Sequence, residues 1–243
     1  MDKKQDKIFH EKQGSIADFD FGARTAEVFD DMLDRSVPFY AEIQRMIAEM
    51  AADFAVPGTN VYDLGCSTCN TFMQLDPLVP KDVAFVGVDS SEAMLDRARE
   101  KLTRRGVTRD CKLLMGDLNK GVDVMNASVV ILNLTLQFVR PLYRGRVVRG
   151  IAEGINTGGC LLLVEKVLSP DSTINRLFIK YYYELKRRHD YSDMEIAQKR
   201  EALENVLIPY HYVENRELLL ESGFKQVDNF FRWYNFCGVL AIK

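Results

Sequence analysis

Residues Asn60–Asn70 constrain the fold of this chain more than any other stretch. They begin with the apolar run Val61–Leu64, which has the length of a buried strand, and continue with Gly65 and several small residues. This order is typical of a first strand whose carboxyl end opens into a ligand-binding loop. A second apolar run, 83–88, ends at Asp89. An acidic residue at the tip of the next strand suits a pair of ribose hydroxyls, so the two features predict a nucleoside ligand.

Apolar runs alternate with amphipathic segments through most of the chain. The expected strands are 60–64, 83–88, 111–115, 127–133 and 160–164, and the expected helices are about 70–77, 91–105, 141–155 and 213–222. Strands that are apolar on both faces and separated by helices predict an α/β fold, with a parallel sheet covered on both sides. After Gly223, the strands 224–231 and 235–242 are expected to finish this sheet as an antiparallel hairpin.

Further helices are expected outside this alternation. Two precede the nucleotide loop, over 24–33 and from Ser36 onward with Ser36 as its cap, and they are candidates for a lid. A helical insert over about 172–207 interrupts the later rhythm. Residues 1–20 are predicted to be poorly ordered, which leaves 21–243 as a single domain.

The composition is that of an ordinary globular protein. The chain is 47% hydrophobic and 28% charged with a net charge of −3, so direct binding to nucleic acid is not expected. The polar start lacks a signal peptide, and no run is long enough to span a membrane. Five cysteines, an odd number, suit reduced thiols better than a disulfide framework. A cytoplasmic protein is therefore expected.

Two further segments bear on which nucleoside binds. Gly116-Asp117-Leu118 follows the third strand, where a carboxylate and a backbone N–H could grip an adenine edge. Asn133 ends the fourth strand, at the edge where open α/β sheets bind ligands. A dinucleotide site would place a third glycine against a pyrophosphate, but Cys69 occupies that place. This favours S-adenosyl-methionine over a dinucleotide.

Two other features have ordinary explanations. Cys66 and Cys69 form a single CxxC without a nearby histidine, so small residues in a turn are favoured over a metal or redox site, and no metal is expected. Arg200 lies within a predicted helix with Glu204 four residues later, which is the spacing of a surface ion pair.

From about residue 19 to the C-terminus, the chain resembles the carboxy-S-adenosyl-methionine synthase family. The segments that carry the resemblance are Ala26-Glu-Val-Phe, Arg35-Ser-Val-Pro, Asp63-Leu-Gly-Cys-Ser, Asn133-Leu-Thr-Leu-Gln-Phe, Glu165-Lys, Tyr191-Ser, Gln198-Lys-Arg and Leu203-Glu-Asn-Val. The segments 133–138 and 198–206 are not general methyltransferase motifs. The resemblance implies a Rossmann-like, seven-stranded class I methyltransferase fold. Its expected activity converts S-adenosyl-methionine and prephenate to carboxy-S-adenosyl-methionine and phenylpyruvate, the former a donor for the tRNA wobble uridine 5-oxyacetic acid modification.

The resemblance also implies roles for individual residues. Contacts to S-adenosyl-methionine, or to its carboxylated product, are expected from Tyr40, Gly65, Cys66, Ser67, Asp89, Ser90, Asp117, Leu118 and Asn133. The new carboxylate is expected to meet Arg200, reaching in from the neighbouring subunit of a homodimer. A guanidinium offers a planar fork to a carboxylate, which a lysine cannot copy. The implied path takes a proton from the sulfonium methyl, giving an ylide that captures carbon dioxide released from prephenate.

One residue departs from the family pattern. Cys69 stands where the family's loop usually has glycine, and its side chain is expected to crowd the methionine portion of the ligand. Two other functions remain as alternatives: an ordinary small-molecule methyltransferase, and a non-catalytic S-adenosyl-methionine-binding partner of a tRNA-modifying enzyme. The mass of the bound ligand would separate all three.

Overall fold

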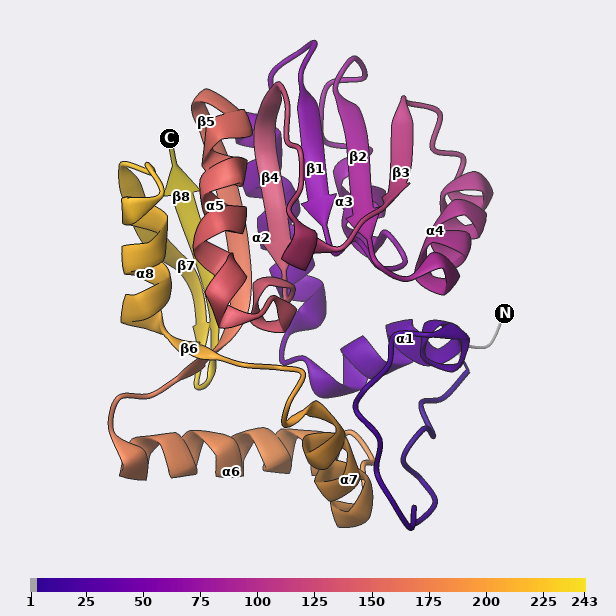
Figure 1. The fold of residues 1–243 in the computed structure, drawn as a ribbon. Helices are drawn as coiled ribbons and strands as arrows, with labels where there is room; N and C mark the ends of the chain where they lie inside the picture. Colours follow the sequence, from indigo (N-terminus) through magenta and orange to yellow (C-terminus); the bar gives the residue numbers. More distant parts are fainter. Residues whose placement is uncertain (1–3) are drawn as a thin grey trace.

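The computed structural model describes residues 4–243, which form one sheet with helices on both faces (Figure 1). The main path of the sheet runs β3-β2-β1-β4-β5-β8-β7, and the short β6 pairs with β5. The strands are β1 Asn60–Leu64, β2 Ala84–Asp89, β3 Cys111–Met115, β4 Ala127–Asn133, β5 Ile155–Leu168, β6 Tyr210–His211, β7 Gln226–Trp233 and β8 Phe236–Ile242. The predicted parallel sheet and closing hairpin are confirmed, since β1 to β5 run parallel and β8 is antiparallel to both β5 and β7.

The helices divide between the two faces of the sheet and a separate layer. Their bounds are α1 Ala23–Ser36, α2 Tyr40–Phe54, α3 Asn70–Leu75, α4 Glu92–Arg105, α5 Pro141–Gly154, α6 Ser172–Arg188, α7 Asp193–Leu203 and α8 Tyr212–Glu221. Short 3-10 turns lie at Leu118–Lys120 and Leu136–Phe138. One core joins α2, α3 and α4 to the sheet, and the other joins α5 and α8 to the opposite face. Alternate residues of β4 enter opposite cores, as a strand buried on both faces requires.

A separate layer of α1, α6, α7 and the N-terminal segment lies below the sheet body in Figure 1, on the side where β1 ends. Helices α6 and α7 form the predicted helical insert. No helix among residues 4–243 is long and apolar enough to cross a membrane. Because ligands of open α/β sheets bind at the carboxyl ends of the strands, we expect a ligand-binding site between this layer and the sheet.

The junction of α1 and α2 differs from the sequence prediction. Ser36 does not cap α2. It is the last residue of α1, and its hydroxyl donates a hydrogen bond to the Met32 carbonyl. The reason is Pro38, which disfavours helical backbone at the preceding Val37. Val37 is extended, the chain turns at Phe39 with φ 51°, and α2 begins at Tyr40.

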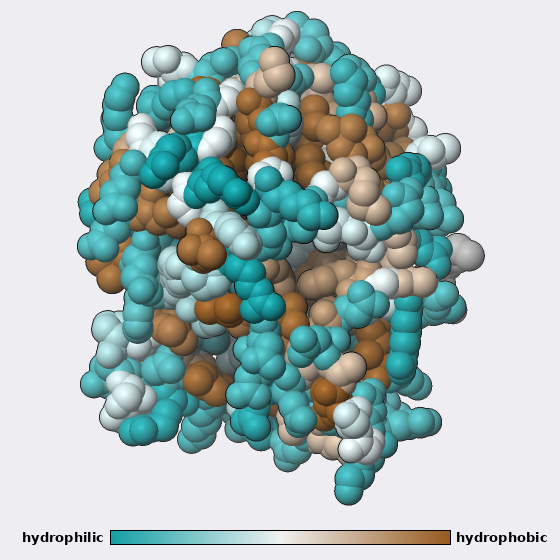
Figure 2. Space-filling model, in the orientation of Figure 1, coloured by the Kyte–Doolittle hydropathy of each residue, from teal (hydrophilic) through white to brown (hydrophobic). Residues whose placement is uncertain are grey.

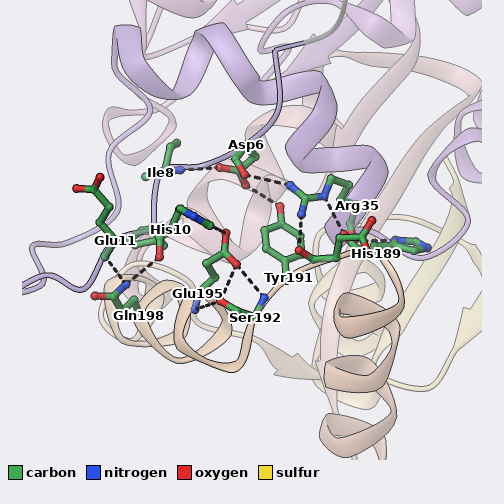
Figure 3. Close-up of polar contacts among 12 residues, drawn as sticks. Asp6, Ile8, His10, Glu11, Arg35, His189, Tyr191, Ser192, Glu195 and Gln198 are labelled. Atoms are coloured by element: carbon green, nitrogen blue, oxygen red, sulfur yellow. Dashed lines mark hydrogen bonds and ion pairs between the residues drawn. The ribbon is translucent and has the colours of Figure 1, made fainter.

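The N-terminal segment also differs from the prediction. Residues 4–20, expected to be poorly ordered, pack against α1 and α7, whereas residues 1–3 lie outside the described part of the chain. Asp6 is only 2% exposed and accepts a hydrogen bond from the Tyr191 hydroxyl at 2.6 Å (Figure 3). The Gln198 side chain donates to the Phe9 and Glu11 carbonyls, both at 2.9 Å. The polar composition suggested disorder, but side chains of distant segments satisfy the backbone groups of this segment.

Candidate active site

A single cavity of about 350 Å³ lies between the carboxyl edge of the sheet and the layer of α1, α6 and α7. Figure 2 shows the surface hollowed near the centre of the view, between these two parts. The cavity has the size of a small-molecule site. Nine of the ten predicted ligand residues line it: Tyr40, Gly65, Cys66, Ser67, Asp89, Ser90, Asp117, Leu118 and Asn133. The structure therefore brings together residues that lie far apart in the sequence.

The loop after β1 is held close to the ends of its neighbouring strands. Gly65 has φ +81°, and a Cβ atom there would collide with the Thr135 side chain. The N–H groups of Gly65 and Cys66 both donate to the Val88 carbonyl, at 2.7 and 3.1 Å. Glycine is needed at position 65 both for the left-handed backbone and for the close approach.

Asp89 is positioned at the tip of β2 by two backbone amides. The Ser67 N–H donates to Oδ2 and the Ser91 N–H donates to Oδ1, both at 2.9 Å. Burial raises the pKa of Asp89, and the backbone amides of Ser91, Ser67 and Ser90 oppose this rise. Each carboxylate oxygen keeps a free acceptor site, so Asp89 can accept hydrogen bonds from two adjacent hydroxyls.

Asp117 lies beyond the end of β3, beside β2. Its Oδ1 accepts hydrogen bonds from the Asn119 backbone N–H at 2.9 Å and from the Asn119 side chain at 3.0 Å. The Gly116 N–H donates to the Asp89 carbonyl at 2.9 Å, which fixes the two strand ends relative to each other. Leu118 is 8% exposed and supplies an apolar surface beside these polar groups.

Several polar atoms of the cavity lack partners within residues 4–243. Asn133 Oδ1 and Gln44 Oε1 are buried without a hydrogen bond. Beside them, the Tyr40 hydroxyl accepts from Gln44 Nε2 at 2.7 Å. Buried polar groups are nearly always paired in native proteins, so these acceptors indicate a ligand that carries hydrogen-bond donors. The ammonium group and hydroxyls of S-adenosyl-methionine are such donors, and the residues present fit this molecule.

Asp63 adds a buried acid to the same cavity. It is 2% exposed, and burial raises its pKa to about 7, partly opposed by the Thr71 hydroxyl. A nearby cation favours the charged form of such a group. Sequence reasoning placed Asp63 on the first strand without giving it a site role, because burial cannot be seen in a linear motif.

Comparisons with known proteins agree with this geometry. Residues 61–159 match a methyltransferase domain family. The carboxy-S-adenosyl-L-methionine synthase of Methylococcus capsulatus is 55% identical over 98% of this chain and 99% of its own length, and that of Desulfotalea psychrophila is 43% identical over 100% and 99%. The chain belongs to the carboxy-S-adenosyl-L-methionine synthase family.

Solved structures confirm the fold at lower identity. An O-methyltransferase family protein from Burkholderia thailandensis superposes with a TM-score of 0.66 at 15% identity, covering 90% of this chain and 60% of that one. Human N-acetylserotonin methyltransferase in complex with SAM gives 0.58 at 14% identity, covering 91% and 55%. The synthase chain therefore has the α/β methyltransferase fold that the sequence predicted.

Arg200 is the one predicted site residue that this synthase chain does not bring to its own cavity. It is exposed on α7, and its guanidinium forms no hydrogen bond or ion pair within the described residues, so the expected ion pair with Glu204 is absent there as well. The adjacent Lys199 is 5% exposed and lines the cavity. Lys166 and Lys186 line it too. Sequence reasoning missed these three lysines, although a lysine inside the apolar run of β5 was a detectable signal.

Cys69 does not line the cavity. It has φ +58° and is fully buried, but its side chain belongs to the core shared by α2, α3 and the sheet rather than to the cavity lining. This placement argues against a clash with the methionine portion of the ligand, which stays a prediction. Cys66 and Cys69 are both free thiols. Among residues 4–243, three or more His, Cys, Asp or Glu side chains do not gather as metal ligands would.

Proposed function

We propose that this chain converts S-adenosyl-methionine and prephenate to carboxy-S-adenosyl-methionine and phenylpyruvate. The stoichiometry balances: prephenate loses one carboxylate and a ring hydroxyl, the carboxylate carbon joins the sulfonium methyl carbon, and the hydroxide and the displaced methyl proton leave as water. The product is proposed to serve, in the cytoplasm, as the donor for tRNA wobble uridine 5-oxyacetic acid. The net charge of −3 supports a small-molecule enzyme rather than one that grips the tRNA itself.

The observation that carries this proposal is the composition of the cavity. The residues predicted to bind the nucleoside line the same space as Lys166, Lys186 and Lys199, and the last two of these lysines are buried. Methyl transfer to a neutral acceptor has no use for a group of buried cations, whereas a reaction between a sulfonium and an anionic co-substrate does. The membership of the synthase family points the same way.

Different residues of the cavity bind different parts of S-adenosyl-methionine. Asp89 accepts from the ribose hydroxyls, and Asp117 with the Leu118 N–H meets the adenine edge. Asn133 Oδ1 and Gln44 Oε1 supply acceptors for the methionine ammonium. Backbone amides fix Asp89 and Asp117, and the Tyr40 hydroxyl holds the Gln44 amide, so the ligand meets a prearranged site.

We also propose a homodimer in which Arg200 completes the partner's site. Its exposure on α7, away from its own cavity, supports a role in the neighbouring subunit. The neighbouring helix α6 exposes Ile174, Leu177 and Tyr181, which are 43, 41 and 39% exposed and recur at helical spacing. An apolar stripe of this kind suits the isologous interface of a two-fold dimer.

Mixing two inactive variants tests the shared site. Arg200→Ala retains its own nucleoside residues, and Asp89→Ala retains its own Arg200. If Arg200 acts in the partner subunit, each mixed dimer holds one intact site, and an equal mixture should recover about a quarter of the wild-type activity. Absence of any recovery, with mixed dimers demonstrated by native mass spectrometry, would show that Arg200 does not act across the interface.

Mass spectrometry of the ligand that survives purification tests the activity itself. The proposal expects a ligand heavier than S-adenosyl-methionine by one carboxylate replacing one hydrogen. It also expects that ligand to accumulate when the protein is incubated with S-adenosyl-methionine and prephenate. Accumulation of S-adenosyl-homocysteine would instead identify an ordinary methyltransferase, and unchanged S-adenosyl-methionine would identify a binding partner without activity.

A further inference from the structure

Three lysines gather at the end of the cavity formed by β5, α6 and α7. Lys186 and Lys199 are 4 and 5% exposed, and Lys166 is half-buried. The ammonium groups of Lys166 and Lys186 lie 4.6 and 4.8 Å from the centre of the same Tyr182 ring. This shared ring places them beside each other, although they come from β5 and α6.

These cations are poorly compensated. Lys199 Nζ is buried without a hydrogen bond, and the nearest carboxylate oxygen, Asp6 Oδ2, lies 3.6 Å away. Within residues 4–243, the ammonium groups of Lys166 and Lys186 form neither hydrogen bonds nor ion pairs and contact aromatic rings instead. Three ammonium groups therefore share one carboxylate, and that carboxylate also accepts from Tyr191.

The electrostatic consequence is that the cluster repels itself. Burial lowers the pKa of Lys199 to about 8, and burial together with the charge of Lys199 lowers the pKa of Lys166 to about 8. The pKa of Lys186 is held well below its usual value by burial and by both other lysines. Buried lysines without charge partners tend to lose their protons, and an anion bound beside them would favour their charged forms.

We infer that Lys166, Lys186 and Lys199 form a subsite for a small ligand with two carboxylates, next to the nucleoside end of the cavity. When all three lysines are protonated, they and Asp6 carry two net positive charges, which matches a dianion, since the nearby Arg35 and Asp31 pair with each other. The depth of the lysines excludes a polymer backbone such as RNA as the occupant. This inference rests on the proposed function, under which the dianion is prephenate.

Lys186→Met and Lys166→Met test the subsite, because methionine keeps the apolar stem and removes the charge. Lys180→Met, an exposed position on the same helix α6, is the matched control. Prephenate is titrated calorimetrically into each protein saturated with S-adenosyl-homocysteine, so that no reaction consumes it. Both cavity variants should bind prephenate at least tenfold more weakly than wild type, while the control and the affinity for S-adenosyl-homocysteine stay within twofold.

Thermal unfolding without ligand separates a binding role from a structural one. Replacing a lysine that only stabilises the fold would lower the melting temperature. Removing an unpaired buried cation should raise the melting temperature of Lys186→Met above that of wild type. A lower melting temperature together with unchanged prephenate affinity would overturn the inference. Preferential binding of inorganic phosphate over dicarboxylates would overturn it as well.

Malonate separates failure of the subsite from failure of the proposed function. If wild-type protein makes no carboxylated product and ignores prephenate, but binds malonate in a manner that Lys186→Met weakens tenfold, the subsite stands and the proposed reaction falls. If wild-type protein makes the product and both lysine variants have the wild-type Michaelis constant for prephenate, the proposed reaction is supported and the lysine subsite is excluded.

Discussion

The two ends of the cavity are built in different ways. At the nucleoside end, Asp89 and Asp117 lie at the tips of parallel strands, and backbone amides hold their carboxylates in place. At the lysine end, Lys166, Lys186 and Lys199 come from a strand and two insert helices and lack close charge partners apart from Asp6. The first end is preorganised by the sheet, whereas the second stores unfavourable charge that a ligand can relieve. The strand ends of the shared fold thus form the first end, whereas α6 and α7 of the insert contribute two of the three lysines at the second.

Replacing Arg200 should have the largest effect, because it should change the affinity for the carboxylated ligand and not that for S-adenosyl-methionine. Loss of one partner from a buried charge pair typically costs about 2–5 kcal/mol. Arg200→Ala should weaken carboxy-S-adenosyl-methionine by that amount and S-adenosyl-methionine hardly at all, as measured by calorimetric titration. Arg200→Lys should recover only part of the loss, because an ammonium cannot make the bidentate contact. Equal weakening of both ligands, or of neither, would remove Arg200 from the site.

The contribution of Asp63 to the free energy of unfolding should fall as pH rises. Its folded pKa of about 7 lies above the ordinary 3.8, so the folded state holds the proton more tightly than the unfolded state. The resulting stabilisation is complete below pH 4 and is lost as pH approaches 7. The isosteric variant Asp63→Asn lacks this titration, so its free energy of unfolding relative to wild type should rise by about 3 kcal/mol between pH 5 and 8.

Urea unfolding of both proteins at the two pH values measures this difference. Lys166 and Lys199, whose pKa values are lowered, titrate in the opposite sense, since their contribution is lost as pH falls. Comparing wild type with Asp63→Asn cancels those groups. A difference that does not change with pH would mean that Asp63 is ionised in the folded protein.

Asp89 tests whether the nucleoside end acts independently of the lysine end. Asp89→Ala should weaken S-adenosyl-methionine by about 1.5–3 kcal/mol, the range for hydrogen bonds to a charged group. Binding of prephenate to the lysine end should change little. Unchanged affinity for S-adenosyl-methionine in a calorimetric titration would exclude Asp89 from the ribose contact.

Cys69 should have the smallest effect. Glycine there would relieve the left-handed backbone strain of about 1 kcal/mol but would also remove a buried side chain, so the net change in stability should be within about 1 kcal/mol. Because the thiol lies in the core rather than in the cavity, Cys69→Gly should keep the affinity for S-adenosyl-methionine. A change of more than threefold in that affinity would mean that the side chain does reach the ligand.

The sequence predicted those site residues that lie at the ends of strands. Asp89 and Asn133 could be placed in a site because each ends a strand of a parallel sheet, and such ends meet at one edge. Lys186 and Lys199 could not, because their burial depends on how α6 and α7 dock against distant segments. Ser36 was misassigned for a local reason, since Pro38 delays the start of α2. Asp6 was missed because a polar N-terminal segment gives no sign of the groups that it will satisfy.

Isotope transfer is the most direct test of the proposed reaction. Prephenate labelled with carbon-13 in its ring carboxylate is incubated with the protein and unlabelled S-adenosyl-methionine, and the nucleoside products are analysed by mass spectrometry. The account predicts carboxy-S-adenosyl-methionine with the label in its new carboxylate. Unlabelled product, or S-adenosyl-homocysteine in its place, would contradict it.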